Sequence, residues 1–146
     1  MSSKQGKILG IDLGDRWVGL AISDSARLLA RPLTTVAAPE LRSFLTDLVQ
    51  REVISTVVVG HPQTMGGGKS QQTLSVETWF QHLQKAFPEQ QWILWDERLS
   101  SQRAAQSGKT TTRAAKLRQH AVAAAFILEL YLIFQSRIRA DDEIGH

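Results

Sequence analysis

Short apolar segments separated by turn residues dominate the first third of the chain, a pattern typical of β-strands. Segments 7–13 and 17–22 flank a short turn with the sequence Gly-Asp-Arg, and a third segment covers 28–36. Strands joined by such short turns pair antiparallel. We therefore predict that the chain begins with a three-stranded antiparallel meander.

Further along, the apolar positions change to the period of an amphipathic helix and recur at i, i+3, i+4, i+7 and i+8. Two helices follow this pattern, the first with Leu41, Phe44, Leu45, Leu48 and Val49 on one face and the second with Val76, Trp79, Phe80, Leu83 and Phe87. A third helix, over about 113–136, is apolar almost all round and should be largely buried. The threonines that precede it can cap its N-terminus.

Two short apolar runs, 53–59 and 92–95, alternate with these helices and suit strands that are buried on both faces of a sheet. Right-handed crossovers would place both runs parallel to the first strand. The predicted fold class is therefore α/β, with a five-stranded mixed sheet covered by helices. We expect one domain over 1–146, with short flexible tails at about 1–5 and 140–146.

The composition narrows the class of protein. The chain has no cysteine, so disulfides and cysteine-based zinc sites are excluded, and its four histidines match no metal-ligand spacing. The N-terminus has no extended apolar region that could serve as a secretory signal. The longest apolar block, 121–132, is interrupted by Glu129 and is too short to span a membrane. We expect a cytoplasmic protein that does not bind membranes.

Positive charge is concentrated in one stretch of the chain. Between residues 98 and 118 there is no acidic residue and there are six basic ones, namely Arg98, Arg103, Lys109, Arg113, Lys116 and Arg118. Since the formal charge of the whole chain is +3, the other residues together carry −3. Such a stretch can bind a phosphate backbone, although a solvated helix face explains the charge alone equally well.

Polar residues follow three of the predicted strands, at the edge where open α/β sheets bind their ligands. They are Asp12, His61 and the pair Asp96-Glu97. Asp12 interrupts an apolar strand, where aspartate is disfavoured, which favours a functional role over a turn contact. Carboxylates that meet at such an edge suit Mg²⁺, and two metal ions can support phosphodiester cleavage. The carboxylates and the basic stretch together indicate hydrolysis of a nucleic acid.

Four motifs in this order and spacing resemble the YqgF (RuvX-like) family. They are Ile8-Leu9-Gly10-Ile11-Asp12-Leu13-Gly14, Val59-Gly60-His61-Pro62 with Met65-Gly66-Gly67, Asp96-Glu97-Arg98-Leu99-Ser100-Ser101, and the apolar run 121–132. The resemblance covers almost the whole chain. It implies an RNase H-like fold and a nuclease that depends on Mg²⁺ or Mn²⁺. The expected role is 5′ processing of precursor 16S rRNA, with Holliday-junction cleavage as the alternative.

The resemblance also suggests roles for individual residues. Asp12 resembles the central metal-ligand carboxylate, and Glu97 resembles the second, with Asp96 as a close competitor. Adjacent strand residues point to opposite faces, so both can reach one site only if the strand has already turned there. The predicted phosphate contacts are the cations Arg98, Arg103, Lys109 and Lys69.

One position departs from the family pattern. Family members usually carry an aspartate in the final helix, directly before the alanine-rich run, and here that residue is His120. His120 shares a helical stripe with Leu117, Ala124, Ile127 and Tyr131, so we expect it to face inward. It either ligates a metal such as Mn²⁺ or is a buried histidine in a weakened site, and the second interpretation is favoured. Weak activity in Mg²⁺ follows from that interpretation.

Two other interpretations are tested by the residues themselves. The run Gly66-Gly67-Gly68-Lys69-Ser70 lacks the first glycine of a P-loop, because position 63 is Gln. Asp12 and Gly14 also resemble the first phosphate loop of actin-like ATPases, which need two such domains. We expect RNA as the partner, with branched DNA as a second possibility, and a monomer or weak homodimer. A ribosome-assembly module that binds RNA without cleaving it stays open because of His120.

Overall fold

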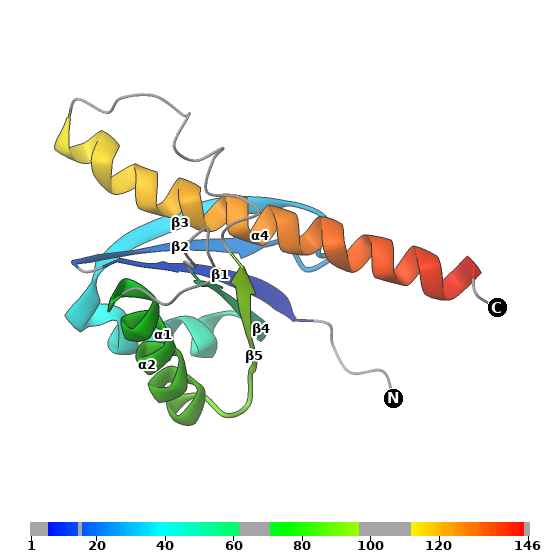
Figure 1. Cartoon of the computed structure of the whole chain (residues 1–146), viewed down its shortest axis with the longest axis horizontal. Coiled ribbons are helices and arrows are strands. Elements are labelled where there is room, and N and C mark those ends of the chain that lie inside the picture. Colours follow the sequence, from blue (N-terminus) through cyan, green and yellow to red (C-terminus); the bar gives the residue numbers. More distant parts are fainter. Residues whose placement is uncertain (1–5, 15, 62–70, 97–111, 145–146) are drawn as a thin grey trace.

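Five strands form one mixed sheet in the computed structural model, which describes residues 6–14, 16–61, 71–96 and 112–144 (Figure 1). The strands are β1 (Lys7–Leu13), β2 (Trp17–Ser23), β3 (Ala30–Ala37), β4 (Ile54–His61) and β5 (Gln91–Asp96). Their order across the sheet is β3-β2-β1-β4-β5. β1 and β3 pair antiparallel with β2, whereas β4 pairs parallel with both β1 and β5. The predicted meander and the two parallel strands are confirmed.

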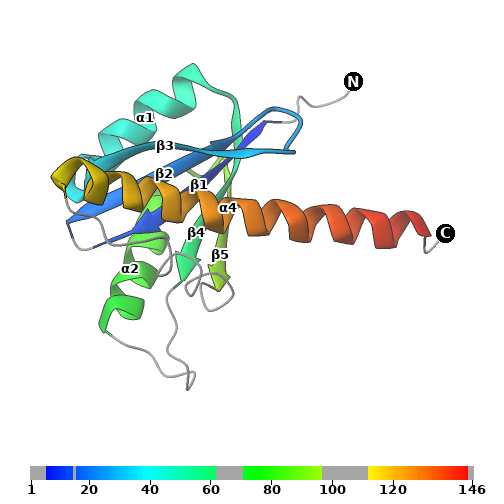
Figure 2. The ribbon, with the colours of Figure 1, turned by 90° about the horizontal axis from the view of Figure 1, so that it is seen from above.

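Helices cover both faces of this sheet (Figures 1 and 2). The short 3-10 turn η1 (Ala38–Glu40) leads into α1 (Leu41–Arg51), and α2 (Gln71–Ala86) connects β4 with β5. α1 and α2 lie together on one face, and the long helix α4 (Arg113–Ile144) crosses the other.

Each face has its own hydrophobic core. The α1/α2 face buries side chains from β1, β2 and β4 against both helices, with Leu9, Ile11, Leu20, Leu41 and Leu83 less than 1% exposed. The α4 face buries a smaller set, with Ile8, Ala21 and Val58 from the sheet packed against Ala124, Ile127, Leu128 and Tyr131. Since residues along a strand alternate between the two cores, the face of each side chain can be assigned by position.

Helix α4 is longer than the sequence pattern predicts. Its N-terminus is capped as expected, because the backbone N–H of Ala115 donates to Oγ1 of Thr112 at 3.0 Å. The helix then continues to Ile144, eight residues beyond the predicted end at 136 and into the segment for which we expected a flexible tail. No glycine or proline interrupts this stretch before Gly145, so nothing in the sequence stops the helix earlier.

The apolar character of α4 also extends further than the block 121–132. By length and composition the segment Leu117–Ile138 could cross a membrane, a criterion that core helices meet as well. In this fold the helix packs against the sheet, where Ala124 and Leu128 are fully buried. Its last turns project past the sheet (Figure 2). Three large apolar side chains of the helix, Ile133, Phe134 and Ile138, are exposed.

Candidate functional site

Asp12 lies near the carboxyl end of β1, the central strand of the sheet, and is half-buried. Its neighbours Ile11 and Leu13 belong to the core beneath α1 and α2. Because side chains alternate along a strand, Asp12 lies on the opposite face, with Ile8, beneath α4. The structure therefore places this carboxylate on the α4 face, at the edge where ligands of such sheets bind.

Helix α4 comes into direct backbone contact with the sheet next to Asp12. Asp12 pairs across the antiparallel ladder with Gly19 of β2. A Cβ atom on Gly19 would lie 1.9 Å from the backbone oxygen of His120 and 2.7 Å from the backbone nitrogen of Ala121. Only a residue without a side chain allows this approach, so Gly19 fixes the height of α4 above Asp12.

His120 faces inward, as predicted, and is half-buried. Its ring carbon Cε1 lies 3.7 Å from the position that a Cβ atom on Gly14 would occupy, at the end of the hairpin that joins β1 and β2. A second tether holds this part of α4, since Oγ1 of Thr35 donates to the backbone oxygen of Leu117 at 2.5 Å. Asp12 and His120 are thus brought to the same face and the same end of the sheet.

Asp96 belongs to the other face. Along β5, Ile93 and Trp95 pack with the core under α4, whereas Trp92 and Leu94 pack with the core under α1 and α2. Asp96 ends the strand and follows Trp95, so alternation places it on the α1/α2 face, away from Asp12. This alternation argues against a site that Asp12 and Asp96 share.

A further polar pair occupies the α1/α2 face at the same edge of the sheet. His61, the last residue of β4, is 7% exposed and its Nε2 lies 2.8 Å from Oε2 of Glu77 on α2. In the parallel ladder His61 is the register partner of Asp96. We expected His61 at this edge, but its link to Glu77 was missed, because a contact between a strand and a helix has no fixed spacing in sequence.

Trp95 contributes an unusual feature to the α4 face. Its ring packs edge-on against Tyr131 at 5.8 Å and Phe134 at 5.4 Å between ring centres. Burial there also raises the pKa of the Tyr131 hydroxyl, which accepts a hydrogen bond from Gln135. The buried Nε1 of Trp95 has no hydrogen-bond partner in the part of the chain that the structure describes. All four tryptophans are at least partly buried, in line with the core positions we expected.

Several predicted site residues lie outside the described residues. These are Glu97, the cations Arg98, Arg103 and Lys109, and Lys69. Among the residues that the structure does describe, no group of three or more His, Asp or Glu side chains is close enough to hold a metal ion. Glu97, a carboxylate of the type that suits a divalent metal, lies among the undescribed residues.

The sequence contains a signal for the close approach of α4 that we did not use. Gly10 and Gly19 each interrupt an apolar strand, and a glycine inside a strand often marks a place where another backbone comes near. At Gly10 a Cβ atom would lie 3.0 Å from the backbone oxygen of Ala124. Both glycines therefore allow α4 to pack close to the sheet on the face of Asp12.

Comparison with known proteins identifies the family of this chain. The model of the RuvX family, described as a Holliday junction resolvase, matches residues 6–133. The chain belongs to the RuvX family. A relative from Staphylococcus aureus is 34% identical over 136 residues, which cover 88% of this chain and 96% of the relative. A relative from Rubrobacter xylanophilus is 41% identical over 101 residues, which cover 69% of this chain and 73% of the relative. Both relatives are named as pre-16S rRNA nucleases.

Solved structures agree on the fold of this RuvX-family chain. The RuvC protein of Thermus thermophilus in complex with a Holliday junction substrate superposes with a TM-score of 0.56 at 15% identity, covering 90% of this chain and 96% of RuvC. A second RuvC structure gives a TM-score of 0.53. The RNase H-like fold that the family resemblance implies is confirmed.

Proposed function

We propose that this RuvX-family nuclease cleaves precursor 16S rRNA in the cytoplasm, using a divalent metal held at the carboxyl end of β1. The observation that carries the proposal is the half-buried Asp12, which interrupts an apolar strand directly beneath α4. Family members from distant bacteria are named for the same activity. Hydrolases of this class depend in general on a divalent metal. We propose that the metal is Mg²⁺ or Mn²⁺.

Asp12 and Glu97 are the proposed metal ligands. Asp96 is the weaker candidate because alternation along β5 puts it on the α1/α2 face with Trp92 and Leu94. Glu97, which resembles the second carboxylate of the family, is the stronger candidate and directly follows Asp96 in sequence. Two carboxylates form a donor set that suits Mg²⁺ or Mn²⁺. When bound, the ion supplies positive charge that stabilises the negative charge developing on the scissile phosphate.

We infer that His120 packs at the site without ligating the metal. It stands where relatives of the family usually have an aspartate, and an imidazole is a poorer ligand for Mg²⁺ than a carboxylate. Its backbone is fixed against Gly19 and its ring lies over the end of the β1–β2 hairpin. This arrangement keeps the geometry of the site but removes a negative charge from it, so turnover in Mg²⁺ should be weak.

The basic residues Arg98, Arg103, Lys109 and Lys69 are proposed to contact the substrate backbone. All four belong to segments that follow the carboxyl ends of β4 and β5 in the chain, the edge at which Asp12 lies. Each contact with a phosphate releases counterions, so binding should weaken steeply as salt is raised. These phosphate contacts position the substrate but do not recognise its base sequence.

A Holliday junction is the second candidate substrate. The description of the family model favours it. Junction cleavage and RNA cleavage require the same metal-assisted hydrolysis, so the site alone does not separate them. The test is cleavage of end-labelled precursor 16S leader RNA beside a four-way DNA junction, with Mg²⁺ and Mn²⁺ compared. Cutting of the junction alone would replace RNA by branched DNA as the substrate, and tight RNA binding without cutting would indicate an assembly factor.

A further inference from the structure

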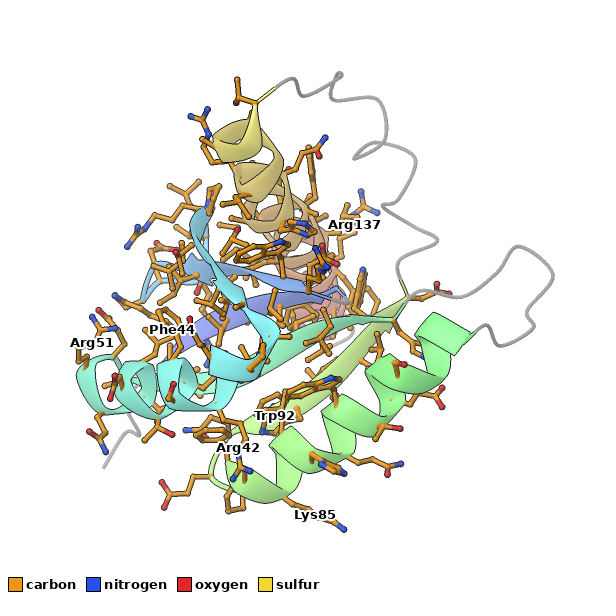
Figure 3. The ribbon with its side chains drawn as sticks, turned by 90° about the vertical axis from the view of Figure 1, so that its left-hand side faces the viewer. Arg42, Phe44, Arg51, Lys85, Trp92 and Arg137 are labelled. Atoms are coloured by element: carbon orange, nitrogen blue, oxygen red, sulfur yellow. The ribbon has the colours of Figure 1, made fainter. Side chains whose placement is uncertain are left out.

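A basic hollow lies between α1 and α2, on the face of the sheet opposite Asp12. It has a volume of about 340 Å³, and its lining consists of Arg42 from α1 with His82, Lys85 and Ala86 from α2. Figure 3 shows Arg42 and Lys85 on the same side of the molecule, with Arg51 at the other end of α1. Three of the four lining residues therefore present nitrogen donors to the same space.

The hydrophobic core holds the backbone of these residues in place. Arg42 directly follows Leu41, and His82 directly precedes Leu83, and both leucines are fully buried. The two leucines belong to one core cluster, which fixes α1 relative to α2. The side chains of the exposed cations are long, but their backbone positions are fixed by the core. Less conformational entropy is therefore lost when they bind a ligand.

The positive charge of the hollow is not neutralised by neighbouring side chains. Within the part of the chain that the structure describes, Arg42, His82 and Lys85 form no ion pair, and Glu40, two residues before Arg42, does not approach it within 4 Å. A cation in the first turn of a helix also interacts unfavourably with the helix dipole. Helix stability therefore does not explain why Arg42 occupies this position.

The chemistry of the hollow fits a phosphate group. Arginine presents a planar fork of N–H donors that matches phosphate oxygens, and lysine adds a compact positive charge. The hollow has a volume of about 340 Å³, which leaves room for a phosphate group and its hydration. Apart from the small imidazole of His82, the lining contains no aromatic ring on which a base could stack, so the hollow suits backbone rather than base recognition.

We propose that Arg42, His82 and Lys85 form a second phosphate-binding site, which holds the nucleic-acid backbone at a distance from the cleavage site. The inference rests on the proposed function, because it takes nucleic acid as the substrate. A strand that reaches both sites must pass from the α4 face around the sheet to the α1/α2 face. Long substrates should therefore use this hollow, and oligonucleotides too short to reach it should not.

The test compares the unmodified protein with the double variant Arg42→Ala/Lys85→Ala, using fluorescently labelled precursor 16S leader RNA. We expect affinity at low salt to fall about tenfold or more, and the slope of log affinity against log salt to fall by about 1.4, at roughly 0.7 for each contact with a single strand. Binding and cleavage of a short single-stranded RNA should not change. The control is Arg51→Ala, which removes another exposed cation from α1 outside the hollow.

The outcomes separate the inference from the proposed function. If the unmodified protein binds leader RNA and the double variant binds it no more weakly than Arg51→Ala, the second site is disproved while the nuclease proposal stands. If the unmodified protein binds neither RNA nor junction DNA, the proposed function fails first. A hollow that takes up inorganic phosphate in a titration followed by NMR, with no effect of the double variant on RNA affinity, would be a site for free anions, contrary to the inference.

Discussion

The backbone oxygen of His120 lies 1.9 Å from the position that a Cβ atom would take on Gly19, the ladder partner of Asp12. This contact packs α4 directly against β2, next to the carboxylate of Asp12 on β1. The proposed site is therefore formed where β1, β2 and α4 meet. The obstacle to a side chain at Gly19 is backbone, which cannot rotate away as a flexible side chain can.

Replacing Gly19 by alanine should therefore push α4 away from the sheet. We expect Gly19→Ala to lower the free energy of unfolding by about 3 kcal/mol, the upper end of the usual cost of overpacking, with loss of nuclease activity. Gly10→Ala is the graded control, since its Cβ atom would meet α4 at the milder distance of 3.0 Å. Urea denaturation measures both variants. Equal stability of Gly19→Ala and the unmodified protein would show that α4 does not need this contact.

The position of Asp96 on β5 predicts that its substitution has less effect on activity than substitution of Glu97. Asp96→Asn should retain most of the activity because its side chain belongs to the α1/α2 face, where Trp92 and Leu94 pack. Glu97→Gln should lower kcat about a hundredfold or more, beyond the effect expected for a residue that merely supports a metal ligand. Cleavage rates at saturating RNA measure both. Loss of activity in Asp96→Asn with normal turnover in Glu97→Gln would reverse the assignment.

The substitution of His120 can be tested by restoring a carboxylate. His120→Asp adds an oxygen ligand and a negative charge on the face of Asp12, and we expect Mg²⁺-dependent turnover to rise about tenfold, or about 1.4 kcal/mol in activation free energy. His120→Asn, which adds no charge, is the control and should give no gain. Equal or lower turnover in a correctly folded His120→Asp protein would mean that the histidine is itself part of the working site.

Trp95 and Trp92 form a matched pair for testing the unpaired indole. Replacement by phenylalanine removes the same atoms at both positions, but Nε1 of Trp92 donates to the backbone oxygen of Phe87 at 2.9 Å, whereas the buried Nε1 of Trp95 has no partner within the described residues. We expect Trp92→Phe to be less stable than Trp95→Phe by about 1 kcal/mol. Thermal unfolding of both variants decides this. A larger loss for Trp95→Phe would show that its donor is satisfied after all.

The features that could be predicted from the sequence are those that depend on the local spacing of apolar residues. The strands and helices follow from apolar spacing, and the inward position of His120 follows from a stripe that includes Ala124 and Ile127. The end of α4 was placed too early, because polar residues after 136 ended the apolar pattern while nothing in them stops a helix.

The remaining parts of the site depend on contacts that no local pattern encodes. The bond between His61 and Glu77 requires the strand-to-helix geometry of the folded chain. The face of Asp96 requires knowing that β5 runs without a bulge as far as its last residue. A glycine inside an apolar strand, such as Gly19, indicates that another backbone comes close. The sequence does not show which one, because His120 on α4 is about a hundred residues away.

The most direct test of the central claim is cleavage of end-labelled precursor 16S leader RNA by the unmodified protein and by Asp12→Asn in Mn²⁺. Asn keeps the size of the side chain but removes the charge that would hold the metal. We predict metal-dependent cleavage that Asp12→Asn abolishes, with RNA binding and the unfolding transition retained. Undiminished cleavage by Asp12→Asn would contradict the account, because the site would then not be centred on β1.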